Sequence, residues 1–512
     1  MAAELPEDAL GRRVLCGQHR ATVRFVGAVP PTEGVWLGVE WDDPTRGKHD
    51  GSREGVRYFT CSHPTGGSFV RPSKASFGAD FLSVLRQRYD DEESDEEIKV
   101  SGKTLKWTEV KERSLESFSV ILLENCPVNG PGVDGQIRQT TPNVRWLNLS
   151  GSLLCGWDDV AAVARQLEHL EGLHLSFNRL RLPSEIAAHR GAFNNLRVLT
   201  LMSCRLTWTQ VLECAPMWPH LEELIVEDND ITRLHRPEGV FGELRCLDLS
   251  KNPLQQDSLL NLAHLPRLQH LIMTDTDFCD IRFPDAAPGA ETSSFASLEN
   301  LNLSCNRISE WRVIDELGKL PSLRQLWCRG NFLVSDDRNP KTANQMLIAK
   351  LPHLCILNGT EVTLQERKGA ECDYLKMFGE EWMQSVARSP SRREFSNRHP
   401  RYSALVDKYG APEEGELKKR QPFALKNQLL KITFVFADEE SRTPLVKKLP
   451  VTMEVRKVKG LLARIMKVPV SDLKLSYTSA KVVGPEYDMD GDLKTLFFYN
   501  VEDGDTILVR RS

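Results

Sequence analysis

The stretch LRCLDLSKNPL, at residues 244–254, contains the pattern that decides the fold. Its apolar residues follow the frame L-x-x-L-x-L-x-x-N/C-x-L, in which a short strand is followed by a turn. Further copies of the frame begin at Phe118, Val144, Leu170, Leu196, Leu221, Leu268, Leu298 and Leu323, with a partial copy from Leu354. One such unit cannot bury its own apolar face, so about eight stacked units are expected to share a continuous core.

This frame is the signature of leucine-rich repeats, and its positions have distinct physical roles. The leucines face inward, while the Asn or Cys lies at the turn and satisfies backbone groups of adjacent coils. The segment WDDVAAVARQLEHL, residues 157–170, has helical apolar spacing and predicts the convex side. A helical stretch from Thr363 is expected to cover the last coil. The sequence therefore predicts an α/β leucine-rich repeat solenoid with a C-terminal cap over residues 118–385.

The N-terminal segment, residues 1–82, has a different pattern. The stretches ATVRFVG, VWLGVEW, VRYFTC and GSFVRP are separated by turn residues, which predicts a small all-β barrel. The run DDEESDEE, at residues 90–97, carries charges of one sign that must be solvated. We therefore expect an acidic linker over residues 83–117.

After the repeats, the polar and proline-containing residues 386–427 predict a second linker. From residue 428 the pattern becomes LLKITFVFADE, a variable turn, VTMEV, the helical VRKVKGLLARIMKV, and the strands LKLSY and DGDTILVRR. Strand–strand–helix–strand–strand in this length predicts a compact α+β roll. It resembles a ubiquitin-like domain over residues 428–512. Two polar linkers favour relative motion of the three folded parts.

The composition excludes several classes of protein. A formal net charge of −5 over 512 residues gives no reason to expect a partner such as nucleic acid. No secretory signal is visible, and no apolar stretch approaches the ~20 residues that span a bilayer. The 12 cysteines form no CxxC pair and no zinc-like spacing. We therefore expect reduced structural cysteines in a soluble intracellular protein without a membrane anchor.

The sequence lacks the motifs of nucleotide binding and catalysis. SGKT, at residues 101–104, has Glu97 where a P-loop needs its first glycine. No G-x-S-x-G, H-E-x-x-H or kinase signature is present. We therefore expect that the protein is not an enzyme and binds no metal or other cofactor.

The stretch GKHDG, at residues 47–51, suits the binding of a carboxylate. Glycines let the backbone approach a ligand closely, Lys48 adds a point charge, and His49 adds a donor. Aromatic and basic neighbours would complete a groove for an acidic peptide with a free terminal carboxylate. The candidate groove residues are Phe25, Trp36, Gly47, Lys48, His49, Asp50, Gly51, Phe69 and Arg71, with Phe59, Arg46, Arg53, Arg57 and Lys74 nearby. The alternative is a tight β-turn whose charges are only solvated.

Residues 11–77 closely resemble a CAP-Gly domain. The segments GRRV, WLGVEWDDP, GKHDGS, G-x-x-YF-x-C and GGSFVRP occur in the order of that family. The resemblance implies recognition of acidic C-terminal tails, including the Glu-Glu-Tyr end of α-tubulin. The family motif is usually GKNDG, so Lys48 matches it and His49 departs from it. In the family the Asn helps to hold the terminal carboxylate, and a histidine can donate in a similar way.

The order of the three modules resembles the tubulin-specific chaperone E family, the tubulin-folding cofactors E. This resemblance covers nearly the whole chain. It implies a non-enzymatic chaperone of the cytoplasm and cytoskeleton that captures α-tubulin. It further implies that other folding cofactors take part, namely β-tubulin-bound cofactor D, cofactor C and the CAP-Gly cofactor B. Together they would join α- to β-tubulin and take existing heterodimers apart.

The concave face of the repeats is the expected surface for the body of such a partner. Its candidate residues lie between the strand leucines: Trp146, His174, Asp248, His270 and Trp327, with Arg145, Thr200 and Asn302 at similar positions. The alternative is an ordinary solvated strand face. The acidic run at 90–97 has two readings as well, a solvated linker or an internal mimic of a tubulin tail in the groove.

Two other functions compete with the chaperone. A microtubule-associated CAP-Gly protein would be expected to carry coiled-coil heptads or several CAP-Gly copies, and neither is seen. A ubiquitin-pathway adaptor would dock a proteasome receptor with its C-terminal domain and select cargo with its repeats. Binding to polymer, or to proteasome subunits without tubulin, would distinguish these functions from the first.

Overall fold

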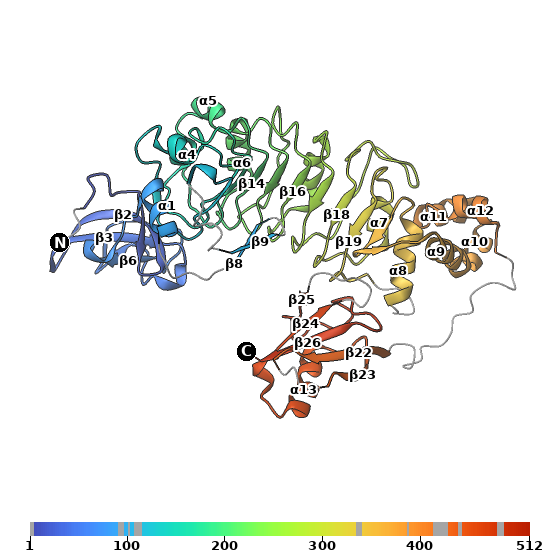
Figure 1. Cartoon of the computed structure of the whole chain (residues 1–512). Coiled ribbons are helices and arrows are strands. Elements are labelled where there is room, and N and C mark those ends of the chain that lie inside the picture. The colour runs from blue at the N-terminus through green and yellow to red at the C-terminus, as the bar shows by residue number, and fades with distance from the viewer. Residues whose placement is uncertain are drawn as a thin grey trace. The chain divides into compact units, whose positions relative to one another are not determined.

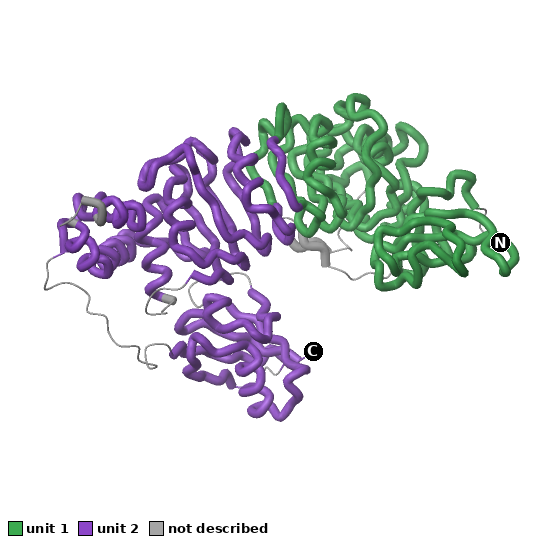
Figure 2. The backbone as a smooth tube through the Cα atoms, turned by 180° about the vertical axis from the view of Figure 1, so that it is seen from behind, with its two compact units in different colours: residues 1–231, 237–248 green, residues 232–236, 249–512 purple. Residues whose placement is uncertain are grey.

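The structure, a computed structural model, describes residues 5–90, 97–100, 103–106, 115–333, 340–386, 389–412, 429–438, 443–478 and 486–511. The chain forms two compact units (Figure 2). The first consists of residues 1–231 and 237–248, and the second of residues 232–236 and 249–512. The repeat region contributes to both units.

Each copy of the repeat frame forms a short strand that begins two residues after the start of the frame, as Leu244 and Cys246 illustrate. The strands of the first unit are β10 (Val120–Leu122), β12 (Trp146–Asn148), β13 (Gly172–His174), β14 (Val198–Thr200), β15 (Glu223–Ile225) and β16 (Cys246–Asp248). Those of the second are β17 (His270–Ile272), β18 (Asn300–Asn302), β19 (Gln325–Trp327), β20 (Ile356–Leu357) and the closing β21 (Thr360–Glu361). Consecutive repeat strands pair in parallel within each unit (Figure 1). The predicted solenoid is confirmed.

A buried asparagine at the turn of many repeats ties it to the preceding coil. Asn178 accepts a hydrogen bond from the backbone N–H of Ser152 at 2.9 Å and donates to the carbonyl of Leu149 at 2.9 Å. Asn229 donates in the same way to Leu201, and Asn331 to Leu303. Unpaired backbone groups cost free energy when they are buried, so this ladder satisfies the coil interiors.

Short helices and 3₁₀ turns follow the strands and bury the other side of each coil. Trp157, Trp208 and Trp218 are almost completely buried there. A capping box between Thr207 and Gln210 begins α6. The elements are α3 (Gln136–Thr140), α4 (Trp157–Ala164), α5 (Ile186–His189), η4 (Arg190–Phe193), α6 (Trp208–Cys214) and η5 (Ala215–Met217) in the first unit, and η6 (Gln256–His264), α7 (Trp311–Leu317) and α8 (Pro340–Lys350) in the second.

The C-terminal cap is larger than the sequence predicted. It comprises α9 (Leu364–Met377), α10 (Gly379–Val386), α11 (Ser389–Arg398) and α12 (Tyr402–Tyr409). Residues 389–398 and 402–409, which the sequence analysis placed in the second linker, are therefore helical. Phe395, Tyr402 and Leu405 are buried against Tyr374 and Leu375 in one apolar cluster. The sequence analysis missed these helices because their apolar residues are widely spaced in an otherwise polar stretch.

The N-terminal module is a small β structure with its own core. Its main sheet has the order β1-β2-β3-β6, all antiparallel: β1 (Arg13–Cys16), β2 (His19–Val29), β3 (Thr32–Trp41) and β6 (Gly67–Val70). Val14, Val23, Leu37 and Val39 are completely buried behind it. The shorter elements are η1 (Pro44–Arg46), β4 (Ser52–Arg53), β5 (Val56–Arg57) and η2 (Pro72–Lys74).

This module is joined to the first repeats by packed structure. β7 (Ala79–Asp80) pairs in parallel with β11 (Val128–Gly130), and α1 (Phe81–Asp90) buries Phe81 and Leu85 beside it. The acidic linker expected from residue 83 thus begins with a packed helix, since the apolar face of α1 covers the start of the solenoid. The acidic residues 91–96 lie outside the described residues, and beyond them β8 (Glu97–Val100) and β9 (Lys103–Lys106) form a hairpin.

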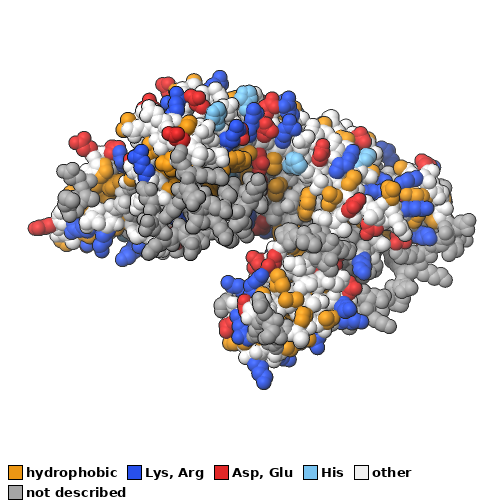
Figure 3. All heavy atoms as spheres, in the orientation of Figure 1, with side chains coloured by type: hydrophobic (Ala, Val, Ile, Leu, Met, Phe, Trp, Pro, Cys, Tyr) orange, Lys and Arg blue, Asp and Glu red, His pale blue; other side chains and the backbone are white. Residues whose placement is uncertain are grey.

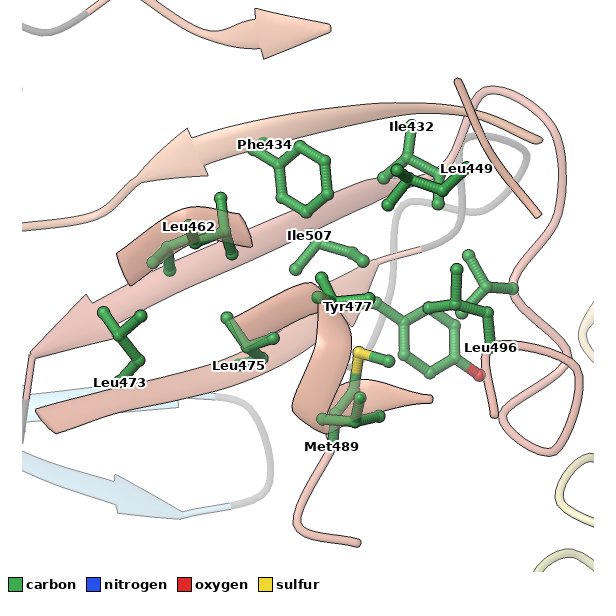
Figure 4. Close-up of a cluster of buried hydrophobic side chains, with 14 of the residues drawn as sticks. Ile432, Phe434, Leu449, Leu462, Leu473, Leu475, Tyr477, Met489, Leu496 and Ile507 are labelled. Atoms are coloured by element: carbon green, nitrogen blue, oxygen red, sulfur yellow. The ribbon is translucent and has the colours of Figure 1, made fainter. Parts of the chain in front are cut away.

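The C-terminal module has the predicted ubiquitin-like roll. Its sheet order is β23-β22-β26-β24-β25, with β22 and β26 parallel. Ile432, Phe434, Leu462 and Ile507 meet in its core (Figure 4). The elements are β22 (Leu429–Phe436), β23 (Leu445–Pro450), α13 (Val455–Met466), η9 (Val470–Asp472), β24 (Leu473–Thr478), β25 (Tyr487–Asp488) and β26 (Thr506–Arg511). The second strand precedes VTMEV, which instead leads into α13.

Lysine and arginine side chains are prominent around the margin of the ubiquitin-like part in Figure 3. In the part of the chain that the structure describes, no helix is both long and apolar enough to cross a membrane.

Candidate functional site

The face of the N-terminal sheet opposite its core carries the candidate groove. The strand register aligns Phe25 with Gly38 and Gly38 with Phe69. In the neighbouring row, Gly27 is aligned with Trp36. Side chains alternate between the two faces of a strand, so these residues share the face that the apolar core does not occupy.

Aromatic rings cluster on this face. The ring of Phe25 meets that of Tyr58 edge-to-face, with centroids 5.3 Å apart, and Tyr58 meets Phe69 at 5.4 Å. Phe59 lies 5.6 Å from Phe69 on the other side. Phe25, Tyr58 and Phe69 remain partly exposed, whereas Phe59 is buried. The cluster therefore offers an aromatic floor that is accessible from solvent.

Two glycines make this close packing possible. A Cβ atom at Gly38 would lie 2.4 Å from the Phe59 ring, and one at Gly27 would lie 2.7 Å from the Phe25 ring. Any side chain at Gly38 would displace Phe59, because the ring is fixed by its other aromatic neighbours.

The GKHDG stretch forms a tight loop fastened to the edge of β6. The backbone N–H of Lys48 donates to the carbonyl of Gly67 at 2.7 Å, and the N–H of Gly67 donates to the carbonyl of His49 at 2.7 Å. Gly47 approaches Thr65 so closely that a Cβ atom would lie 1.9 Å from its carbonyl oxygen. Gly51 has a φ of +98°, which favours glycine. Both glycines are thus required by the loop itself.

His49 faces the aromatic floor in a defined tautomer. Its Nδ1 accepts a hydrogen bond from the N–H of Gly51 at 3.1 Å, and its ring lies 4.9 Å from the Phe69 ring. An accepting Nδ1 places the ring proton on Nε2. Burial lowers the pKa of His49, which also favours the neutral ring. Nε2 has no protein partner among the described residues, so it presents a free N–H donor.

Lys48 and Asp50 have different roles on either side of His49. Lys48 is exposed, and its amine makes no ion pair among the described residues. The Asp50 carboxylate accepts from the N–H of Ser52 at 3.0 Å and pairs with Arg57 at 2.9 Å. The hydrogen bonds from Ser52 lower its pKa. Asp50 was one of the predicted groove residues, but its carboxylate has the same charge as a peptide carboxylate, and its contacts stabilise the loop.

Trp36 and Arg71 form a separate pair at one end of the groove. The Arg71 guanidinium lies 3.9 Å from the centroid of the Trp36 ring. It also donates to the carbonyl of Glu33 at 2.8 Å. The structure therefore brings Phe25, His49 and Phe69 together and places Trp36 and Arg71 beside them. Tyr58, a further member of the floor, was not among the predicted groove residues, although it belongs to the quoted G-x-x-YF-x-C segment.

The predicted concave residues lie in two rows on one face of the repeat sheet. In the first unit, Trp146 is aligned with Gly172, and His174 with Thr200, Ile225 and Asp248. In the second unit, one row begins at His270 and the other at Ile272. Asn302 and then Trp327 continue the row of Ile272. The ring of Trp146 lies where a Cβ atom of Gly172 would stand, and its centroid is 6.1 Å from that of His174. Burial lowers the pKa of His174.

Comparison with known proteins gives the family of the chain. The family model for the CAP-Gly domain matches residues 10–75. The tubulin-specific chaperone E of Danio rerio is 51% identical over 518 residues, which cover 99% of this chain and 99% of that protein. The chain belongs to the tubulin-specific chaperone E family.

A second relative matches over the full length. The tubulin-specific chaperone E of Homo sapiens is 45% identical over 527 residues and covers 100% of both chains. The solved C-terminal ubiquitin-like domain of mouse tubulin-specific chaperone E is 50% identical and covers 17% of this chain and 88% of that structure, with a TM-score of 0.16. Family membership confirms the resemblance that the order of the modules suggested.

Proposed function

We propose that this protein is a tubulin-folding cofactor that binds α-tubulin at two places. The acidic C-terminal tail of α-tubulin enters the CAP-Gly groove, and the folded body contacts the concave face of the repeats. With cofactors B, C and D, the protein promotes assembly and disassembly of the αβ-tubulin heterodimer in the cytoplasm. Support comes from the family name, which specifies tubulin, and from the chemistry of the groove.

The observation that carries this proposal is the free Nε2–H of His49 beside the exposed Lys48 amine. Their chemistry suits a terminal carboxylate, which would accept a hydrogen bond from the imidazole and pair with the ammonium. The locked Nδ1 holds the donor in place before the ligand arrives, so little ordering is needed on binding. His49 thus supplies the donor that asparagine supplies elsewhere in the CAP-Gly family.

The aromatic floor suits an aromatic side chain at the C-terminal residue of the tail. Phe25, Tyr58 and Phe69 offer ring edges and faces to a terminal aromatic side chain, and such pairs add to the free energy of simple burial. Arg53 and Arg57 lie on the adjacent hairpin of β4 and β5, where they pair with Glu54 and Asp50. Lys48, which makes no ion pair among the described residues, supplies the positive charge that attracts the acidic residues preceding the tip.

Two contacts made by one chain strengthen each other. Because the groove is packed onto the first repeats through β7 and α1, binding of the tail holds the body near the repeat face. The second contact then forms at a high effective concentration, and the combined affinity exceeds that of either contact alone.

The test is retention of purified αβ-tubulin, with and without its C-terminal tails, on immobilised full-length protein. We expect Lys48→Ala to weaken retention of intact tubulin about tenfold and to leave retention of tail-less tubulin unchanged, because the lost charge contacts only the tail. Lys368→Ala, an exposed lysine of α9, is the matched control.

Equal retention of intact and tail-less tubulin by wild type and Lys48→Ala would refute the carboxylate clamp. Retention of microtubules without retention of free heterodimer would instead favour a microtubule-associated CAP-Gly protein. Capture of proteasome subunits without tubulin would favour the ubiquitin-pathway adaptor.

A further inference from the structure

Three arginines gather where the N-terminal module meets the first repeats. Arg20 of β2 donates to the side-chain oxygen of Asn125 at 3.1 Å. Arg205 donates to the backbone carbonyl of Asp42 at 3.0 Å, and the N–H of Asp42 donates to the carbonyl of Arg20 at 3.1 Å. Arg179 donates at 2.5 Å to a backbone carbonyl two residues before Arg205. Arg20, Arg179 and Arg205 are called the junction arginines below.

The positive charges of the junction arginines are not neutralised by the protein. The acceptors just described are neutral oxygens, and none of the three guanidinium groups makes an ion pair with a described residue. The Asp42 carboxylate is held by Arg13 through both of its oxygens, at 2.6 Å for one of them. Asp228 accepts from the hydroxyl of Ser203 and pairs with none of the three. The cluster therefore carries an excess of positive charge.

The surroundings of the cluster favour the binding of an anion. Burial lowers the pKa of Arg179, and although Asp42 opposes this shift, the charges of Arg205 and Arg13 add to it. Burial also lowers the pKa of Arg20. Half-buried guanidinium groups that repel one another gain free energy when an anion binds between them, and their planar forks match carboxylates. Arg205 is exposed, so the cluster is accessible from solvent.

The junction arginines lie within reach of a peptide whose end is bound at His49. Gly67 is paired with Glu40 of β3 on one side and with His49 on the other. Adjacent strands lie about 4.8 Å apart, so the backbones of Glu40 and His49 are about 10 Å apart. Asp42, whose carbonyl binds Arg205, follows Glu40 by two residues. About five residues of extended chain, at ~3.3–3.6 Å each, span this distance.

We propose that the junction arginines bind the acidic residues of the α-tubulin tail that precede its terminal carboxylate. This inference rests on the proposed function and adds a second recognition site for the same tail. Both modules contribute to the site, since Arg20 comes from the N-terminal sheet and Arg179 and Arg205 come from the repeats. The carboxylates of the tail supply the negative charge that the protein lacks there. A tail without acidic residues at this distance from its end is held by the groove alone.

The test compares two labelled peptides of about ten residues, a length that reaches past the cluster. One has the native C-terminal sequence of α-tubulin. In the other, every Glu and Asp before the terminal Glu-Glu-Tyr is replaced by Gln or Asn. Fluorescence anisotropy with the full-length protein should show about tenfold tighter binding of the acidic peptide by wild type. Arg20→Gln and Arg205→Gln keep a side-chain donor but lose the charge. Each should bind the acidic peptide about fivefold more weakly and the neutralised peptide as wild type does.

Two further variants separate charge from structure. Arg205→Lys keeps the charge and should bind the acidic peptide within about threefold of wild type. Arg190→Gln removes an exposed arginine of η4 and should leave the binding of both peptides unchanged.

Equal weakening of both peptides by Arg205→Gln would show that this arginine only holds the two modules together, and would overturn the inference. Equal binding of both peptides by wild type would refute the acidic site and leave the carboxylate groove standing. Failure of wild type to bind either peptide would refute the tail contact of the proposed function, and the junction site with it.

Discussion

At the scale of single residues, the two nitrogens of His49 have separate tasks. Nδ1 accepts from Gly51 and shapes the loop, and Nε2 is left to meet a ligand. The sequence predicted the position of His49 and its capacity to donate. It could not predict which nitrogen is used, because that depends on the fold of the loop. The sequence also did not reveal that the seventh residue after each full frame start, from Asn125 to Gly330, has a positive φ, since residue types as different as Lys251 and Cys305 occupy this position.

The neutral state of His49 leads to a prediction about pH. Its folded pKa is lowered, so protonation occurs only below the usual range and would break the hydrogen bond from Gly51. We expect the affinity for a tubulin-tail peptide to stay constant between about pH 7.5 and 6.5, in wild type and in His49→Asn alike. His49→Ala should bind about tenfold more weakly, because it lacks the donor.

Fluorescence anisotropy of a labelled tail peptide would measure these affinities. A wild-type affinity that rises steeply on acidification while His49→Asn stays flat would mean that an imidazolium binds the carboxylate, contrary to the geometry described.

At the scale of elements, the repeat frame predicted the parallel strands β10 and β12 to β20 because each frame position is tied to burial. Leu147, Leu173 and Leu199 are the buried centres of successive strands, and their spacing alone locates them. Helices α11 and α12 were not predicted because the apolar residues that anchor them, such as Phe395, Tyr402 and Leu405, are widely spaced in a polar stretch. Their stability comes from packing against α9, which a local pattern does not reveal.

The helical cap contains a buried histidine that should make it sensitive to acid. His399 is 7% exposed, and its Nδ1 lies 2.7 Å from the hydroxyl of Tyr374. Burial lowers its pKa to about 3. The unfolded chain, with a histidine pKa near ~6.5, therefore takes up the proton first as pH falls. This histidine alone should lower the free energy of unfolding by about 2 kcal/mol between pH 7 and 5.

Chemical denaturation at the two pH values would measure the free energy of unfolding of wild type and of His399→Gln. The difference between the two proteins removes the pH-dependent contributions of other groups. One of these is Asp315, whose pKa burial raises to about 6 and whose contribution has the opposite sign. An identical pH dependence of both proteins would contradict the buried neutral state of His399.

At the scale of the whole molecule, the sequence analysis predicted linkers between the folded modules. Within each compact unit, however, these modules contact one another. In the first, Arg20 donates to Asn125 at 3.1 Å, and Arg205 donates to the carbonyl of Asp42 at 3.0 Å. In the second, the 7%-exposed Arg329 donates to the hydroxyl of Tyr477 at 3.2 Å. The sequence predicted independent motion, because contacts between distant surface residues leave no periodic pattern.

The contact in the second unit can be tested by truncation of Arg329. This side chain also lies over the rings of Tyr477 and Tyr487, and Phe332 meets Phe498 beside it. Arg329→Ala should release the ubiquitin-like domain from the last repeats, so backbone amides near Phe332 and Phe498 should exchange with deuterium at least about fivefold faster. Arg510→Ala, which breaks an ion pair with Glu486 in the same domain, is the control. Unchanged exchange in Arg329→Ala would show that the contact contributes little.

The packed attachment of the N-terminal module to the first repeats has a consequence for substrate choice. Because β7 and α1 pack the groove onto the first repeats, the distance between the groove and those repeats is limited. The end of a bound tail and the body from which it emerges must be separated by a set span of extended chain, at most ~3.3–3.6 Å for each residue. Proteins with equally acidic but shorter tails would engage the groove or the repeats, never both together. Tail length then becomes a criterion of selection alongside tail chemistry.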